Sequence, residues 1–208
     1  MGPITVGVDI GQKRDSTAIA VVEMEWRADQ GRLEDYHIVR RLERLPLGTG
    51  YPDVAARLTT VVTALQKRGA WPAVYVDATG VGQPVVDMLA RGGLHLTAVY
   101  FTWGDRRTKK DGQISLGKAW LVSRLQALLQ TGRILLPKTA EATALSKELL
   151  DYEIRVTEDA NETYGAFSTG AHDDLVTALG LAVQDEARVE QGYAVGGYRD
   201  SVAGFQVY

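Results

Sequence analysis

The sequence predicts an α/β fold with a mixed central sheet, in which antiparallel opening strands join parallel strands and helices flank the sheet. Two short runs rich in β-branched residues, 4–9 and 16–23, are separated by a turn that contains Gly11, which is typical of an antiparallel hairpin. A strand, helix, strand order then runs from residue 73 to residue 101 and implies at least one parallel pair. Helical spacing of apolar residues recurs along the rest of the chain.

The first half of the chain is expected to alternate strands and helices. Pro46 and the Gly-Thr-Gly turn after it end the third strand, and Gly69 ends the helix that follows. Pro84 suits the first turn of a second helix. The elements expected here are a strand at 33–45, a helix at 52–68, a strand at 73–77, a helix from residue 84 onward and a strand at 94–101.

The second half is expected to add a basic loop, a hairpin and three helices. Residues 102–115 show no periodicity and are expected to form the loop. Alternating residues at 151–156 and 164–168, on either side of an acidic turn, predict a β-hairpin before the last helix. The other elements expected are a helix at 116–131, a brief strand at 133–136, a helix at 140–149 and a last helix that opens at residues 170–174, with Leu175, Ala178, Leu179 and Ala182 as its apolar face. The folded domain is expected to span residues 1–190, with a flexible tail at 191–208.

The composition of the chain indicates a globular protein and limits the kinds of metal ligand that it can offer. A chain of 208 residues with 45% hydrophobic and 24% charged residues suits one ordinary globular domain. No apolar run approaches the ~18–20 residues that span a bilayer, so no membrane partner is expected. The absence of cysteine excludes disulfides and thiolate metal sites and leaves carboxylates, three histidines and carbonyl groups as possible ligands. A net charge of −3 still permits a local basic patch that binds nucleic acid.

Aspartates stand at three places where a carboxylate is costly or strongly positioned. Asp9 and Asp77 each end a short apolar strand, and Asp173 with Asp174 opens the last helix. A buried charge must be neutralised, paired or bound to a metal. Neighbouring parallel strands would bring Asp9 and Asp77 to one edge of the sheet, and the last helix can bring its N-terminus to the same place. The structural alternatives are a turn cap for Asp9 and a helix N-cap for one of the later pair.

Carboxylates gathered within a few ångströms repel one another unless cations lie between them. Oxygen ligands without cysteine favour Mg²⁺ or Mn²⁺ over zinc. Two such ions, roughly 3.5–4 Å apart, stabilise the attacking and leaving oxygens in phosphodiester cleavage. The acidic positions therefore predict a two-metal phosphodiesterase site.

Three motifs in this order carry a resemblance to a known family. They are Val8-Asp9-Ile10-Gly11 with Asp15-Ser16-Thr17-Ala18, Val74-Tyr75-Val76-Asp77-Ala78-Thr79-Gly80-Val81-Gly82, and His172-Asp173-Asp174-Leu175-Val176-Thr177-Ala178-Leu179. Together they resemble the C-terminal nuclease domain of tailed-phage large terminase subunits, over roughly residues 4–186. That family has an RNase H-like fold and cuts double-stranded viral DNA during genome packaging, in the cytoplasm of the infected host cell.

The resemblance implies roles for the acidic residues. Asp9, Asp77 and Asp173 would hold two catalytic Mg²⁺ or Mn²⁺ ions, with Asp174 an additional ligand or a near neighbour. The ATPase motor that normally precedes such a domain is missing from this sequence, so the chain is expected to be one domain of a longer parent. Portal and small-terminase partners would be reached through that parent.

Basic residues are expected to bind the DNA, mainly through phosphates, because no helix carries a row of side chains suited to reading base edges. The cations expected in this role are Arg106, Arg107, Lys109, Lys110, Lys118 and Arg155. The alternative for the run 106–110 is a solvated loop. Residues 112–119 nearly form a P-loop, but Ala119 stands where the magnesium-binding hydroxyl belongs, so Lys118 is interpreted as a helix-start cation.

Other functions use a similar set of residues. A Holliday-junction resolvase or transposase core would carry the same carboxylates, and a resolvase would act as a dimer with two sites. The opening hairpin also resembles the phosphate-binding hairpin of the sugar-kinase and actin superfamily, which needs two lobes. A third class is a binding module that docks on a portal without catalysis, against which the intact acidic set argues.

Overall fold

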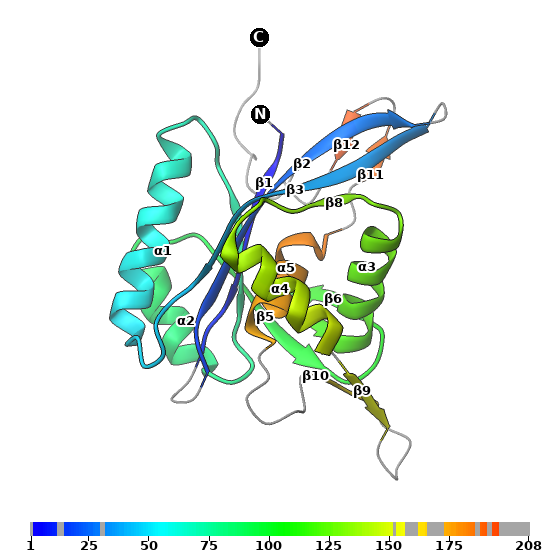
Figure 1. Cartoon of the computed structure of the whole chain (residues 1–208). Helices are drawn as coiled ribbons and strands as arrows, with labels where there is room; N and C mark the ends of the chain where they lie inside the picture. The colour runs from blue at the N-terminus through cyan, green and yellow to red at the C-terminus, as the bar shows by residue number, and fades with distance from the viewer. Residues whose placement is uncertain are drawn as a thin grey trace.

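The computed structural model describes residues 2–11, 15–29, 32–151, 153–156, 162–165, 173–185, 188–190 and 193–195. An eight-stranded sheet lies at its centre, in the order β6-β7-β5-β4-β1-β2-β3-β8 (Figure 1). Its strands are β1 Ile4–Asp9, β2 Ala18–Asp29, β3 Arg32–Arg44, β4 Ala73–Asp77, β5 Thr97–Thr102, β6 Arg107–Lys110, β7 Gln113–Gly117 and β8 Ile134–Leu135. Two further pairs are β9 Glu153–Val156 with β10 Glu162–Gly165, and β11 Arg188–Glu190 with β12 Tyr193–Val195.

The directions of the strands confirm the predicted mixed sheet. β1, β2 and β3 are antiparallel neighbours, whereas β1, β4, β5 and β7 run parallel to one another. β6 returns antiparallel along β7 at one edge, and the short β8 lies parallel to β3 at the other. The β9–β10 pair confirms the predicted hairpin before the last helix.

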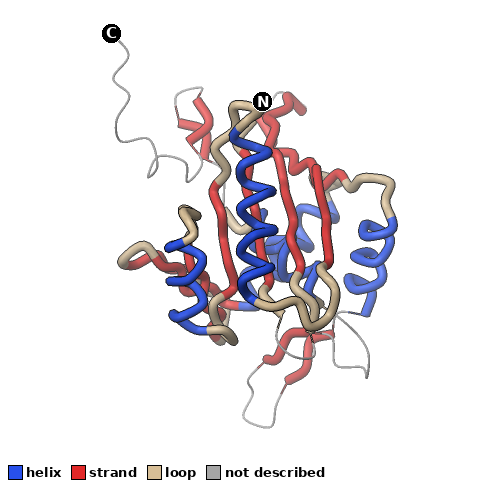
Figure 2. The backbone as a smooth tube through the Cα atoms, turned by 90° about the vertical axis from the view of Figure 1, so that its left-hand side faces the viewer, coloured by secondary structure: helices blue, strands red, loops and turns tan. Residues whose placement is uncertain are grey.

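Helices form a layer on each face of the sheet. They are α1 Tyr51–Gln66, α2 Gly82–Arg91, α3 Lys118–Gln130, α4 Ala140–Asp151 and α5 Asp174–Val183. Figure 2, viewed from the side of α1 and α2, shows α1 lying along the strands. One apolar core joins α1 and α2 to the sheet, and a second joins α3, α4 and α5 to the opposite face. Among the helices of the described residues, none combines the length and the apolar character needed to cross a membrane.

Helix α5 is the most deeply placed helix. All ten of its residues are buried, because it packs on β1, β2 and β4 and is itself covered by α3 and α4. The predicted apolar face of Leu175, Ala178, Leu179 and Ala182 is therefore right but incomplete. A helix that is apolar all round is a buried helix. This position matters because the N-terminus of α5 carries the acidic pair.

The expectation of an irregular loop at 102–115 is wrong. The segment forms the hairpin β6–β7, and α3 begins at Lys118 rather than at residue 116. The turn residues Asp111 and Gly112 have φ angles of 52° and 77°. Two successive positive φ values are what a tight hairpin turn needs, and an Asp-Gly pair supplies them readily. The Asp111-Gly112 dipeptide is the feature of the sequence from which this hairpin could have been predicted.

Other boundaries differ by a few residues. β2 continues to Asp29, past residue 23, because its hairpin with β3 extends to the pairing of Asp29 with Arg32. β5 begins at Thr97 rather than at residue 94. β12 lies in the range expected as a tail, and residues 196–208 lie outside the described residues.

Candidate active site

Two parallel strands bring the first two aspartates to one edge of the sheet. Val8 of β1 pairs with Val76 of β4, and the next residue on each strand is Asp9 or Asp77. Both strands are otherwise apolar and mostly buried, so each carboxylate lies where its strand leaves the core. The predicted meeting of strand ends is thus present in the structure.

The start of α5 adds acidic charge at the same place. Burial raises the pKa of Asp9 well above its usual range, and the negative charges of Asp77, Asp173 and Asp174 raise it further. Burial also raises the pKa of Asp77, with a contribution from Asp173. These carboxylates are close enough to disfavour one another's ionisation. They form one acidic cluster drawn from residues 9, 77, 173 and 174.

Lys118 provides the positive charge in this cluster. It is the first residue of α3, and its Nζ lies 5.4 Å from the centre of the Phe101 ring. Its charge opposes the rise in the pKa of both Asp9 and Asp77. Lys118, predicted to be a DNA-binding cation, therefore lies beside the carboxylates.

Asp77 is held by the loop that follows its strand. The Thr79 backbone N–H donates to Asp77 Oδ1 at 2.8 Å, and the Thr79 hydroxyl accepts a bond from the Phe101 backbone N–H at 2.7 Å. The bond to Phe101 ties this loop to β5. Burial raises the pKa of Asp77, and the side chain and backbone N–H of Thr79, which both bond to the carboxylate, lower it in part. Thr79 stands inside a motif quoted from the sequence, but the sequence does not reveal this role.

The donor chemistry of the cluster fits a hard divalent cation. Its ligands are carboxylate oxygens, and their mutual repulsion would be relieved by a positive ion between them. In the conformation seen here, no three His, Asp or Glu side chains of the described residues converge tightly enough to coordinate one ion together.

Asp174 is engaged differently from the other three. It is 4% exposed, and both of its carboxylate oxygens accept bonds from Arg44, Oδ2 from Nε at 2.9 Å and Oδ1 from Nη2 at 2.6 Å. Asp173 is the residue that precedes α5, and its side chain makes no capping hydrogen bond. The N-cap residue Asp173 therefore does not cap α5 through its side chain, whereas Asp174 Oδ1 accepts one bond from the first turn, from the Leu175 backbone N–H at 3.1 Å.

Glu148 of α4 supplies the missing cap. Its Oε2 accepts bonds from the backbone N–H groups of Leu175 at 3.0 Å and Val176 at 3.2 Å, while its Oε1 accepts from Arg44. Arg44 is 130 residues from Asp174 and 104 from Glu148 along the chain. No local pattern links residues so far apart, so sequence reasoning missed both partners.

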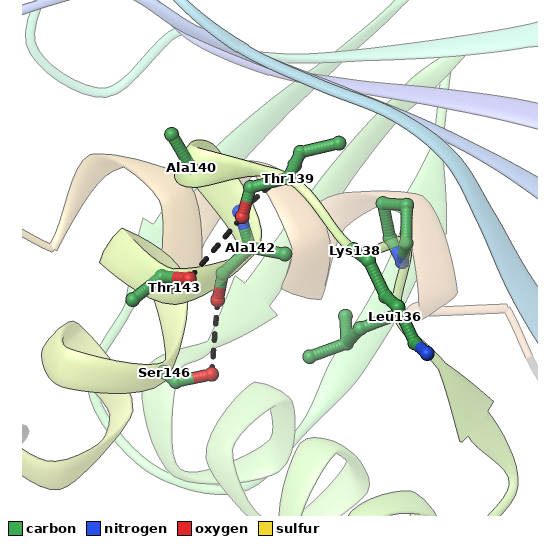
Figure 3. Close-up of a pocket in the computed structure, with 8 residues that line it drawn as sticks. Leu136, Lys138, Thr139, Ala140, Ala142, Thr143 and Ser146 are labelled. Carbon is green, nitrogen blue, oxygen red and sulfur yellow. Dashed lines mark hydrogen bonds between the residues drawn. The ribbon is translucent and has the colours of Figure 1, made fainter.

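A surface pocket of about 550 Å³ lies away from this cluster, at the N-terminal end of α4 (Figure 3). Two of its hydroxyl groups already donate to backbone oxygens four residues earlier, Thr143 to the Thr139 oxygen at 3.2 Å and Ser146 to the Ala142 oxygen at 2.9 Å. None of the predicted site residues lines it. The predicted catalytic residues lie in the acidic cluster instead.

Comparison with known proteins identifies the family. The model of the terminase RNase H-like domain matches residues 6–186. The chain belongs to this family. No curated protein matches the sequence. The predicted large-terminase relationship and RNase H-like fold are confirmed.

Solved structures agree with that assignment. The large terminase nuclease of thermophilic phage G20c is 26% identical, with a TM-score of 0.63 over 86% of this chain and 80% of that one. The same nuclease with bound magnesium gives 22% identity and a TM-score of 0.61, over 87% and 80% of the two chains. The nuclease domain of the bacteriophage SPP1 large terminase with bound manganese shares the fold at 14% identity and a TM-score of 0.50, over 86% and 84%.

The predicted DNA-binding cations of this terminase domain fall into separate groups. Arg106, Lys109 and Lys110 are exposed at the β6 edge of the sheet. Arg107 instead donates to Gln184 Oε1 at 2.8 Å and forms an ion pair with Asp185, just beyond α5. Arg155 lies on β9, and its side chain, like the whole of His172, lies outside the described residues.

The register of the sheet relates the basic edge to the acidic cluster. Asp77 pairs with Val99, Val99 with Ile114, and Ile114 with Lys109. Three strand spacings of about 4.8 Å put the backbone of Lys109 about 14 Å from that of Asp77. That span is smaller than the width of a DNA duplex.

Proposed function

We propose that this domain is a metal-dependent endonuclease that cuts double-stranded viral DNA, with little sequence specificity, during genome packaging. The observation that carries the proposal is the acidic cluster, with Asp9 and Asp77 at neighbouring strand ends and Asp173 at the start of α5, in a terminase RNase H-like domain. Its relatives are large terminase nucleases, which supports nuclease chemistry here.

Asp9, Asp77 and Asp173 would hold Mg²⁺ or Mn²⁺, two ions in all. Magnesium and manganese bound to two solved large-terminase nucleases support a divalent metal. The chemistry that two such ions supply is stabilisation of the attacking and leaving oxygens of the phosphodiester. Asp174 would be a near neighbour of the metals, because Arg44 already occupies both of its oxygens.

The remaining residues would position the substrate. Lys118, beside the carboxylates, is suited to contact the scissile phosphate or a neighbouring one. Arg106, Lys109 and Lys110, with Arg155 on the β9–β10 hairpin, would contact phosphates along the duplex and carry no base specificity. Arg107 would support this surface through its ion pair with Asp185.

The biological setting follows from the family. The domain would act in the cytoplasm of the infected host cell, within a longer large-terminase chain whose motor moves the DNA. Contacts with the portal and the small terminase subunit would be made through that parent chain.

Incubation of supercoiled plasmid with the domain tests the proposal. Mn²⁺ or Mg²⁺ should give nicked and linear products without a fixed sequence at the ends, and EDTA should prevent cleavage. Asp9→Asn and Asp77→Asn should each abolish cleavage, because each removes a charged metal ligand. Asp87→Asn, on the exposed surface of α2, is the matched control and should cut normally. Intact plasmid at high protein concentration in Mn²⁺ would count against nuclease function.

A further inference from the structure

Arg44 joins three elements that are far apart in the sequence. It is the last residue of β3, and it bonds Asp174 at the start of α5 and Glu148 near the end of α4. The two carboxylates are 4% and 6% exposed. A guanidinium between two buried carboxylates is a strong link, because its planar fork binds a carboxylate through two bonds at once.

The link fixes the first turn of α5. The first N–H groups of a helix have no partner within the helix and need one from outside. Glu148 accepts from two of these groups, at Leu175 and Val176, while its other oxygen is bound to Arg44. The position of the α5 N-terminus is therefore set from β3 and α4 together.

Asp173 and Asp174 are adjacent but have different environments. Both oxygens of Asp174 accept bonds from Arg44, whereas the Asp173 side chain makes no capping bond. The charges of both aspartates raise the pKa of Asp9, that of Asp173 more, and Asp173 also raises the pKa of Asp77. Asp174 anchors the helix start through Arg44, and Asp173 acts more strongly through its charge on the carboxylates at the strand ends. The two aspartates differ in role because only Asp174 is bonded to Arg44 among the described contacts.

We propose that Arg44 and Glu148 are positioning residues of the candidate active site. They hold the first turn of α5 so that Asp173 stays beside Asp9 and Asp77 as the metal-binding carboxylate of that turn. Asp174 is the anchor through which Arg44 acts. This inference rests on the proposed function, since it concerns the same site and the same ions.

The most informative variant is the double substitution Arg44→Gln with Glu148→Gln. It removes one positive and one negative charge together, so the net charge of the trio stays at minus one. Arg44→Gln alone would leave two buried carboxylates facing each other, which destabilises a protein strongly. Arg41→Gln is the control, because Arg41 also lies on β3 but its ion pair with Glu43 is exposed.

Mn²⁺ affinity, measured by calorimetry on the metal-free protein without DNA, is the first readout. Loss of groups that orient metal ligands weakens metal binding by roughly 10–100-fold. The double variant should fall in this range, whereas Arg41→Gln should match the wild type. With DNA and saturating Mn²⁺, kcat should fall while KM for plasmid stays constant, because the basic surface is untouched. Arg44→Lys should lie between these extremes, since it keeps the charge and loses the fork.

Melting curves separate positioning from a purely structural role. A double variant that melts earlier but binds Mn²⁺ within about twofold of the wild type, with unchanged kcat, would overturn the inference. If the double variant does not fold, Glu148→Gln alone, which keeps the Arg44–Asp174 pair, should still weaken Mn²⁺ binding, and unchanged binding would overturn the inference equally. Wild-type protein that neither binds Mn²⁺ nor cuts DNA would instead remove the proposed function.

Discussion

Gly7 of β1 lies against Ala178 of α5 so closely that a Cβ atom at position 7 would stand 2.0 Å from the Ala178 carbonyl oxygen. The same atom would lie 2.6 Å from the backbone nitrogen of Ala182. α5 therefore rests directly on the backbone of β1. Because the strand ends two residues later at Asp9, this contact also sets how the start of α5 meets the first carboxylate.

Gly7→Ala should destabilise the domain. The added methyl group meets backbone atoms on a buried helix, so α5 or β1 must shift, and overpacking of this kind costs about 1–3 kcal/mol. Urea unfolding with a two-state fit gives the change in the free energy of unfolding. Gly180→Ala is the comparison, since the atoms nearest to its Cβ, at 2.5–2.7 Å, belong to the side chain of Leu121 rather than to the backbone, and alanine is favoured in helices. Its cost should therefore be smaller. Equal effects of the two substitutions would mean that the α5–β1 approach is not tight.

Asp9→Asn should stabilise the metal-free domain, and more so as the pH rises. Burial and the neighbouring carboxylates raise the pKa of Asp9, so the folded state disfavours its ionised form. That penalty is absent below about pH 4, where Asp9 is protonated in both states, and it grows as pH rises toward the folded-state pKa. The difference in the free energy of unfolding between Asp9→Asn and wild type should therefore increase from pH 4 to pH 8 in EDTA. A difference that does not change with pH, or loss of the fold, would contradict the acidic-cluster interpretation of Asp9.

Thermal unfolding of wild type and Asp9→Asn in excess Mn²⁺ tests whether Asp9 is a metal ligand. The wild type should gain more thermal stability from Mn²⁺ than Asp9→Asn does, since only the wild type retains the full set of carboxylates. An equal gain would show that Asp9 is not a ligand.

Arg106→Ala with Lys110→Ala should weaken DNA binding without changing its sequence preference. Each phosphate contact that is lost reduces the slope of log affinity against log salt by about 0.9, so the pair should flatten it by about 1.8. Titrations with two unrelated duplexes at several salt concentrations measure this. Lys67→Ala with Arg68→Ala removes the same charge from the exposed end of α1, before β4 begins, and should leave the slope nearly unchanged. If both pairs flatten the slope alike, only net charge matters and the β6 edge is not the DNA surface.

Asp35→Asn should destabilise the domain at neutral pH. Burial raises the pKa of Asp35, but the hydrogen bond from His37 at 3.0 Å and the charge and hydrogen bond of Arg124 at 2.9 Å outweigh it and lower the pKa to about 2. A lowered carboxyl pKa stabilises the folded state above about pH 4 and ceases to do so as pH falls toward 2. Lowering the pKa of Asp35 from 3.8 to about 2 corresponds to at most roughly 2–3 kcal/mol of folding free energy.

Acid titration of unfolding checks this. The substitution should lower the free energy of unfolding by up to about that amount at pH 7 and flatten its dependence between pH 4 and pH 2. Asp105→Asn, at an exposed position, should change neither. A wild-type-like acid profile for Asp35→Asn would show that His37 and Arg124 do not depend on this carboxylate.

The sequence alone determined the mixed character of the sheet and the two strand-end carboxylates. Short β-branched runs gave β1 and β4 with their observed ends at Asp9 and Asp77. The strand–helix–strand order at residues 73–101 implied a parallel pair, because crossover connections make neighbouring strands parallel. The ends at Asp9 and Asp77 were expected to meet if β1 and β4 were such neighbours, and the structure pairs them in parallel. These inferences succeed because they depend on local periodicity and on rules of chain connection.

The tertiary structure alone decided which charged residues pair. Arg44 reaches Asp174, and Arg107 reaches Asp185, over separations of 130 and 78 residues. Asp174 is therefore tied to β3 through Arg44. Arg107, one cation of the basic run, forms an ion pair just beyond the end of α5. Neighbouring residues with the same charge look alike in a sequence, since an ion pair depends on where the fold brings its partner and not on spacing along the chain.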